Sequence, residues 1–153
     1  MILAHHHPAY TAGAKHGWSS SLTAEMDAIC AEAGVWPHAV LSAHAHNYQR
    51  FTRTAGGRQT PYVIAGNGGH GLGKLTRKAT GPLRVPTAVQ DVAGDRVVFE
   101  SYDDQGYGCL RIRVTMEQLR IEYHPAGDGA TAKTPDDAVT IDLATRRIAH
   151  FNA

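Results

Sequence analysis

Two clusters of histidines in the first 46 residues each follow directly on a short apolar run. The run "MILA" leads into "HHHPAY", and the run "AVL" leads into "SAHAHNYQR". Between them, Ser21 can cap a helix over residues 22–33 that Gly34 would end. A strand, a helix and a strand form a βαβ unit, whose right-handed crossover makes the two strands parallel. Because parallel strands end at the same edge of a sheet, we expect the two histidine clusters to meet there.

The remainder of the chain is mainly a series of short alternating runs that predict β-strands. Residues 62–65 form one such run, and the loop at 66–73 contains five glycines. From Val97 onward, runs such as "VVFESY", "CLRIRV" and "LRIEYH" predict an antiparallel meander, and residues 125–137 predict a hairpin loop. The predicted fold class is therefore α/β, with one N-terminal βαβ unit followed by a mainly antiparallel β meander. The predicted apolar face of the helix comprises Leu22, Met26, Ile29, Cys30 and Ala33.

The composition predicts a single domain over residues 1–153. Hydrophobic residues make up 42% of the chain, which is enough for an ordinary core. Fifteen basic residues against fourteen acidic ones leave a net charge of +1, so we expect neither a nucleic-acid partner nor a membrane surface. No stretch approaches the roughly 20 apolar residues that cross a bilayer, and Cys30 and Cys109 form no CxxC pair. The sequence predicts a soluble chain and leaves its compartment open.

The histidines carry the strongest signal of chemistry, because seven of the ten lie within the first 46 residues. Neutral imidazole is the commonest protein ligand for zinc, iron and manganese-type metals. Three nitrogens that converge from two adjacent loops would supply most of a coordination shell. His44 and His46 can both bend toward one region from a loop, although the same pattern also fits two exposed loop histidines. We therefore predict a metal-binding edge.

Several motifs, in the order in which they occur, resemble those of one enzyme family. "VLSAHAHNYQR" resembles the last motif of the calcineurin-like metallophosphoesterases, Gly-His-x-His, in the form seen in enzymes similar to purple acid phosphatases. "LAHHHPAY" resembles the preceding His-x-Pro-x-Tyr motif, "YVIAGNGG" the glycine-rich strand that follows, and "GYGCLRIRV" a C-terminal strand. This resemblance implies a partial metallophosphoesterase β-sandwich that hydrolyses phosphate monoesters or diesters with metal-activated water.

The resemblance also implies roles for individual histidines. His6 stands two residues before a proline, where the family has a metal ligand, and His44 and His46 match two histidines that bind one metal each. His16 falls near a histidine that binds phosphate or protonates the leaving group in some relatives, which makes it the candidate catalytic residue. The implied cofactor is a divalent or trivalent ion of Fe, Zn or Mn, and the implied ligand is a phosphate ester.

Residues around these histidines are candidates for binding the substrate. They are His7, Tyr48, Arg50, Gly68, Gly69 and His70. The glycine-rich loop offers backbone N–H groups to a phosphate, or it forms a tight turn beside the site. Tyr48 and Arg50 would orient the substrate, or they would pack and pair locally.

The chain departs from the family in its acidic ligands. Such enzymes hold two metals with an Asp-x-His, a Gly-Asp-x-x-Asp that includes the bridging carboxylate, and a Gly-Asn-His, and none of these motifs occurs here. Asp91, Asp95, Asp103 and Asp104 follow no pattern that supplies the bridge. The absent motifs lead us to expect that the family's N-terminal half is missing. Two cations held mainly by neutral imidazoles would repel each other, so we also expect the site to be incomplete in one copy. Ala43 replaces the motif's glycine, and its methyl group would crowd the turn if that residue needs a positive φ.

Two functions fit these observations. The first is a metal-dependent phosphoesterase whose carboxylates arrive from another chain or an upstream segment. The second is a truncated, non-catalytic module that binds a metal or a partner. In either case, missing strands would leave a sheet edge and an apolar face uncovered, so we expect a homo-oligomer whose partner covers them.

Overall fold

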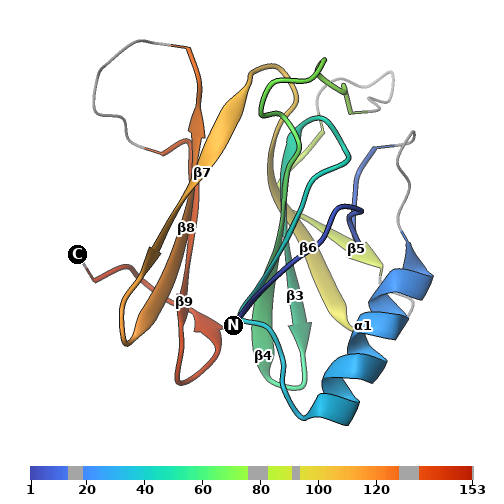
Figure 1. The fold of residues 1–153 in the computed structure, drawn as a ribbon, viewed down its shortest axis with the longest axis vertical. Coiled ribbons are helices and arrows are strands. Elements are labelled where there is room, and N and C mark those ends of the chain that lie inside the picture. Colours follow the sequence, from blue (N-terminus) through green and yellow to red (C-terminus); the bar gives the residue numbers. More distant parts are fainter. Residues whose placement is uncertain (14–18, 76–82, 91–93, 128–134, 153) are drawn as a thin grey trace.

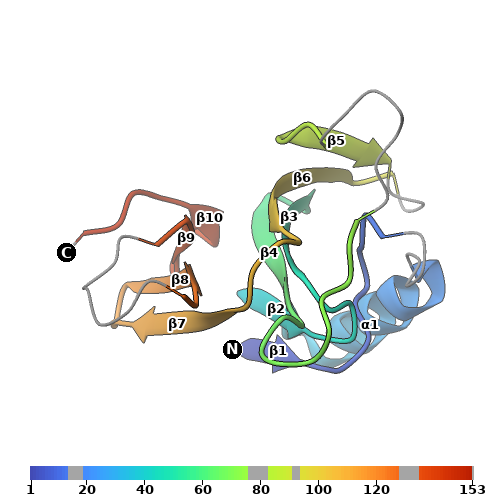
Figure 2. The same ribbon diagram turned by 90° about the horizontal axis from the view of Figure 1, so that it is seen from above.

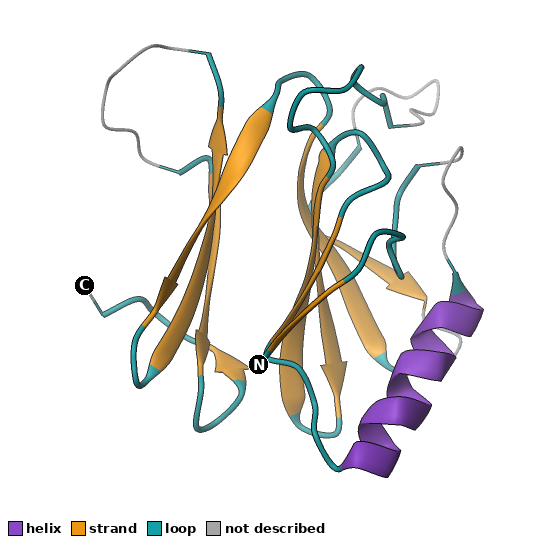
Figure 3. Ribbon diagram, viewed as in Figure 1, coloured by secondary structure: helices purple, strands orange, loops and turns teal. Residues whose placement is uncertain are grey.

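The structure is a computed structural model that describes residues 1–13, 19–75, 83–90, 94–127 and 135–152. The described part holds one helix and two β-sheets stacked in three layers (Figure 1, Figure 3). The helix covers one face of the first sheet, and the second sheet covers the other. This mixed α/β arrangement confirms the predicted fold class.

The first sheet has six strands in the order β1-β2-β4-β3-β6-β5, and the second has four in the order β10-β9-β8-β7. In chain order the elements are β1 (Ile2–Ala4), α1 (Ser20–Ala33), β2 (Ala39–Ser42), β3 (Tyr48–Ala55), β4 (Arg58–Ala65), β5 (Thr87–Gln90), β6 (Arg96–Asp103), β7 (Gly108–Val114), β8 (Gln118–Pro125), β9 (Asp137–Asp142) and β10 (Arg147–Ile148).

The N-terminal βαβ unit forms as predicted. β1 and β2 pair in parallel, with Ala4 opposite Leu41, and β4 adds to the other side of β2, also in parallel. Figure 2 shows α1 beside β1 and β2. Beyond the strands, the His5 N–H donates to the Leu41 carbonyl and the Ala43 N–H donates to the His6 carbonyl, each at 3.1 Å. These bonds confirm that the two histidine segments leave the sheet at one edge.

The helix begins with a different cap from the one predicted. Ser19 has an extended backbone (φ −109°, ψ 97°), and its side chain accepts a hydrogen bond from the Leu22 N–H. Ser21 lies inside the first turn, where its backbone is helical, so it cannot be the N-cap. Gly34 ends the helix as predicted, with a φ of +64° that suits glycine.

The predicted meander is wrong at its first strand. The run "VVFESY" belongs to β6, which pairs with β3 and β5 in the first sheet. The meander of the second sheet begins only at β7 and continues through β8, β9 and β10. An alternating strand has the same pattern in either sheet, so its sequence does not distinguish the two places. β8 and β9 pair as antiparallel neighbours, as a hairpin requires, and residues 128–134 of the predicted loop lie outside the described residues.

Each face of the first sheet contributes to its own core. Successive residues of β4 enter different clusters: Tyr62 and Ile64 join the cluster that contains Met26 of the helix, whereas Val63 joins the cluster between the sheets. The inter-sheet cluster comprises Ala39, Tyr48, Val63, Leu119, Ile121, Tyr123, Val139 and Ile141. The first sheet is therefore fixed from both sides, which holds the ends of its parallel strands in place.

The predicted apolar face of the helix is buried only in part. Met26 and Cys30 are buried together with Thr23, which the prediction omits, whereas Ile29 is 66% exposed and Ala33 is also exposed. The exposed part borders a groove of about 390 Å³ between β1 and α1, lined almost entirely by apolar side chains. This groove lies at the outer strand of the first sheet. The expected homo-oligomer stays a prediction. In the described part of the chain, no helix is long and apolar enough to cross a membrane.

Candidate metal centre

Three imidazole rings from two strand ends meet at the edge of the first sheet. His6 and His7 follow β1, and His44 follows β2. The His6 Nε2 and His44 Nδ1 atoms lie 3.1 Å apart, and the ring centroids of His7 and His44 lie 4.3 Å apart. One ligand nitrogen from each of the three residues lies within 4.8 Å of the other two. The predicted meeting of the two histidine clusters is confirmed for His6, His7 and His44.

A tight turn of the backbone presents His44 to its partners. The Ala45 N–H donates to the Ala43 carbonyl at 2.6 Å, which closes a three-residue turn around His44. His44 has a φ of +58°, whereas Ala43 is not among the positive-φ residues. The crowding expected at Ala43 therefore does not arise, and the unfavourable conformation falls on His44 at a cost of roughly 1–2 kcal/mol. Backbone strain of this kind is concentrated at functional sites.

His46 lies in a second, separate pair. Its Nδ1 atom is 3.0 Å from the Gly71 carbonyl oxygen and 3.2 Å from the His70 Nδ1 atom. The Gly73 N–H donates to the His46 carbonyl at 2.7 Å, and the Asn47 side chain donates to the Gly73 carbonyl at 2.8 Å. The predicted ligands are therefore divided, because His6 and His44 meet each other whereas His46 meets His70 of the glycine-rich loop.

One glycine of that loop is required by a close approach. A Cβ atom on Gly66 would lie 2.0 Å from the Ala45 carbonyl oxygen, so no side chain fits there without moving the histidine loop. Gly68 and Gly69 have open space around them, and Gly69 has a φ of +151°. Asn67, which lies between Gly66 and Gly68, is fully buried. Its side chain donates to the Gly106 carbonyl and to the Tyr123 hydroxyl. Sequence reasoning missed this anchor, for which the only signal was an asparagine within a glycine run.

Tyr48 and Arg50 bind the second sheet. The Tyr48 ring stacks on Tyr123 at a centroid distance of 3.9 Å, and its hydroxyl donates to Asp137 at 2.6 Å. Arg50 donates twice to the same carboxylate, at 2.7 and 2.9 Å. Burial raises the pKa of Tyr48, with a further contribution from Asp137, so the phenol stays protonated and donates. Burial acts to raise the pKa of Asp137, but the bonds from Arg50 and Tyr48 outweigh it and leave that pKa lowered. Tyr48 and Arg50 therefore pack and pair locally, which is the second of the two roles that the sequence left open for them.

Four of the described carboxylates have partners of their own. Asp27 and Asp95 bind Arg53, Asp103 accepts from Tyr123, and Asp104 accepts from the Leu75 N–H. Among the described residues, no carboxylate joins the three imidazoles. Asp91 and the candidate catalytic residue His16 lie outside the residues that the structure describes.

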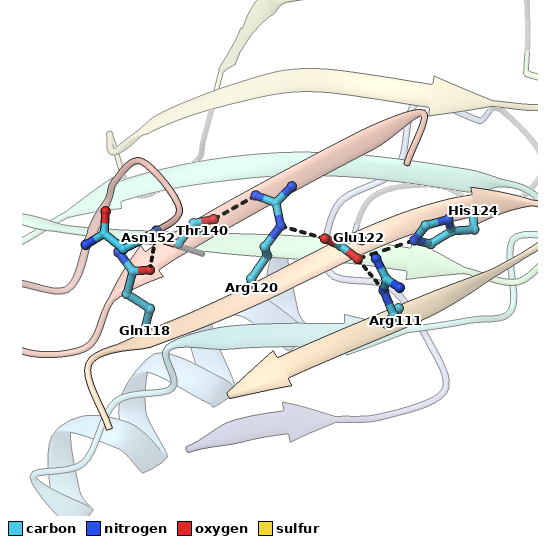
Figure 4. A network of polar contacts seen from close by, with 7 residues as sticks. All are labelled: Arg111, Gln118, Arg120, Glu122, His124, Thr140 and Asn152. Atoms are coloured by element: carbon cyan, nitrogen blue, oxygen red, sulfur yellow. Dashed lines mark hydrogen bonds and ion pairs between the residues drawn. The ribbon is translucent and has the colours of Figure 1, made fainter. Parts of the chain in front are cut away.

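A second polar cluster, missed by sequence reasoning, lies on the second sheet (Figure 4). Glu122 is 3% exposed and contacts Arg111, Arg120 at 2.7 Å and His124 at 3.3 Å. The hydrogen bond from Arg111 is the strongest influence, and with those from Arg120 and His124 it outweighs burial and lowers the pKa of Glu122 to about 2. In "CLRIRV" and "LRIEYH", charged or titratable residues alternate along each run, and this alternation was the sequence signal that these side chains share one face of the sheet. This cluster braces β7 against β8.

Comparison with known proteins gives a single kind of similarity. No family model matches the chain, and no curated protein sequence matches it. Among solved structures, the chain is similar to the purple acid phosphatase PPD1 from yellow lupin (Lupinus luteus) seeds, with a TM-score of 0.63 and 17% sequence identity. The match covers 95% of this chain and 25% of that chain. At this identity the similarity is one of fold alone, and the chain spans a quarter of the length of the phosphatase.

The donors at the sheet edge also indicate which ions they suit. Three neutral imidazole nitrogens favour zinc, copper, nickel or iron, whereas magnesium and calcium prefer oxygen ligands. The residues present therefore fit a metal of the first group, and the edge can act chemically as a site for a Lewis acid.

Proposed function

We propose that this chain is a metal-dependent phosphoesterase-like protein that carries the histidine half of a hydrolytic site. In this proposal His6 and His44 hold one ion of Fe or Zn, the two expected metals that imidazole suits best, and His46 holds a second. The observation that carries it is the 3.1 Å approach of the His6 and His44 nitrogens at the ends of two parallel strands, in a fold similar to that of a purple acid phosphatase. When bound, such ions activate water and polarise the phosphoryl oxygens of a phosphate monoester or diester.

The chain's own residues prepare this edge for an anionic ligand. A hydrogen bond from His46 Nδ1 to the Gly71 carbonyl selects the tautomer whose lone pair is on Nε2, the usual way in which a metal-ligating histidine is oriented. His70 is exposed and lies against His46, with ring centroids 4.3 Å apart, so its ring is placed to contact a phosphate bound beside His46. The Gly68 and Gly69 backbone belongs to the same exposed turn.

The described part of the chain brings no carboxylate into the imidazole group, which favours one alternative. The described aspartates nearest in sequence to the later strands are engaged with Arg53, Tyr123 and Leu75, and the imidazole group contains none of them. Two dications without a bridging anion repel each other. The alternative is therefore a non-catalytic metal-binding module, and the phosphoesterase requires carboxylates from another chain or segment.

Hydrolysis assays with matched histidine variants test the proposal. The full chain, stripped of metal and then supplied with Zn²⁺, Mn²⁺ or Fe²⁺, is assayed with an aryl phosphate and an aryl phosphodiester. If a second copy of the chain supplies the carboxylates, we expect metal-dependent turnover. Both His44→Ala and His46→Ala should abolish it, and His150→Ala, which removes an exposed histidine of the C-terminal segment, should leave it unchanged. Metal binding without turnover would favour the non-catalytic module. Turnover that survives both edge substitutions would contradict the proposal.

A further inference from the structure

We propose that His6, His7 and His44 bind a single zinc-class cation as a three-imidazole site that needs neither His46 nor a carboxylate. This assigns His7 as a metal ligand, in place of the substrate-binding role expected from the sequence. It also concerns only what this chain binds alone, so it does not depend on phosphoester hydrolysis.

The spacing of the first two nitrogens suits one tetrahedral ion. Two nitrogens bound to the same zinc at about 2.0–2.1 Å lie roughly 3.3 Å apart. The His6 Nε2 and His44 Nδ1 atoms are 3.1 Å apart, so a cation can replace the proton between them with a small outward shift of the rings. The backbone bond between Ala43 and the His6 carbonyl fixes the two residues across the sheet edge.

A bend after β1 brings His7 into the same group. In an extended strand, consecutive side chains point to opposite faces, but the chain bends at His6 and His7 before reaching Pro8. As a result both rings approach His44, with centroid distances of 5.0 Å for His6 and 4.3 Å for His7. The ligand nitrogens of all three lie within 4.8 Å of one another. Because the His6 and His7 side chains are exposed, a rotation of the His7 ring closes the remaining gap without disturbing the core.

The neutral donor set limits both the number and the kind of ion. Each added dication brings two positive charges, and no carboxylate of the described part offsets them within the group, so the site holds one ion. Imidazole nitrogens select Zn²⁺, Co²⁺, Ni²⁺ or Cu²⁺ over Mg²⁺. With three protein ligands, water takes the fourth position, the arrangement of open zinc sites.

The backbone already holds His44 in the conformation that the site needs. Its φ of +58° is unfavourable for a residue with a side chain, and the fold maintains it through the turn at Ala43–Ala45. Strain maintained by the fold reduces the ordering cost of binding, which is the general advantage of a preorganised site. His46, by contrast, is oriented toward Gly71 and His70, so it does not compete for the same ion.

Metal titration of the full chain tests the site without any reference to activity. The metal-free protein is titrated with Zn²⁺ by calorimetry and with Co²⁺ by visible absorption, which reports coordination geometry. We expect one equivalent to bind, and we expect His6→Ala, His7→Ala and His44→Ala each to weaken binding at least tenfold, because even changes outside the first shell of ligands cost about that much. The matched controls His46→Ala and His70→Ala change the affinity by less than about twofold.

The outcomes separate this site from the proposed hydrolysis. Binding of one equivalent that depends on His7 supports the three-imidazole site, whether or not turnover is found. Loss of binding in His46→Ala equal to that in His7→Ala overturns it, and so does the absence of binding to Zn²⁺ and Co²⁺ at micromolar concentration. Unchanged circular dichroism of metal-free His7→Ala establishes that a lost affinity does not reflect a lost fold.

Discussion

The polar groups at the sheet edge and those at the interface between the sheets differ in how their charges are paired. At the interface, the Arg50 and Asp137 side chains are each 12% exposed and meet in a two-point ion pair, and Tyr48 completes the hydrogen bonding of that carboxylate. At the edge, imidazoles contact imidazoles, and no carboxylate of the described residues belongs to the group. Removing one partner of a buried ion pair is costly because it leaves the other charge buried and unpaired, whereas imidazole nitrogens that converge near the surface are suited to binding a cation. We therefore expect substitutions at the interface to affect stability and substitutions at the edge to affect ligand binding.

The largest effect should come from breaking the interface pair. Arg50→Ala removes the ionic partner of Asp137, whose side chain is largely buried. A buried charge without a partner lowers the free energy of unfolding by about 3 kcal/mol. Urea denaturation measures the change. The exposed Arg84 provides the control, since Arg84→Ala should alter the free energy by less than about 0.5 kcal/mol. Equal losses from the two substitutions would show that the interface pair contributes nothing special.

A smaller loss of folding stability is expected from a substitution at Gly66, beside the loop that carries His44. Gly66→Ala places a Cβ atom 2.0 Å from the Ala45 carbonyl oxygen, so the loop that carries His44 must move at a cost of about 1–3 kcal/mol. Because this loop carries His44 of the proposed metal site, the affinity for Zn²⁺ should fall several-fold as well. Gly68→Ala is the matched control, because nothing lies within 4 Å of its added methyl group. If the two variants bind Zn²⁺ equally, the contact at Ala45 does not position the site.

The polar cluster around Glu122 on the second sheet predicts that the stability of the fold depends on pH. The pKa of Glu122 lies at about 2 in the folded protein, below its ordinary value of 4.5. A lowered pKa stabilises the fold above about pH 4.5, and this contribution is lost as the pH falls toward 2. Unfolding measured from pH 5 to pH 2.5 should show a shallower loss of stability in Glu122→Gln than in the unaltered chain. Parallel curves would mean that the contacts with Arg111 and Arg120 do not favour the charged carboxylate.

Sequence reasoning succeeded where short-range pattern and topology suffice. The β1-α1-β2 unit follows from two apolar runs around a capped helix, and the right-handed crossover then requires His6 and His44 to lie at one edge. The placement of β6 could not be obtained in this way, because an alternating strand suits either sheet. The roles of Tyr48 and Arg50 were also left open, because their shared partner Asp137 lies more than 80 residues away in the chain.

The grouping of the histidines depended on features that sequence patterns do not encode. Whether His7 or His46 joins His6 and His44 is decided by a bend after β1 and by a turn with positive φ at His44. The glycine in the related motif suggested strain at position 43, yet the structure places it one residue later. The direction of a histidine ring in a loop depends on such local dihedral angles. The residue types in these loops are compatible with several sets of dihedral angles, so the sequence does not determine the direction of each ring.

The smallest effect on the metal-free fold is expected from His7→Ala. The side chain is exposed, so the substitution should change the free energy of unfolding by less than about 0.5 kcal/mol. The two proteins should differ only when a metal is present. Zn²⁺ at one hundred times its dissociation constant should stabilise the unaltered chain by about 2.7 kcal/mol, and the variant should gain much less at the same concentration. Denaturation with and without Zn²⁺ measures both quantities. A variant that is destabilised without metal would place His7 with the structural residues of the interface, whereas a variant that lacks only the zinc-dependent gain would place it with the ligands of the edge.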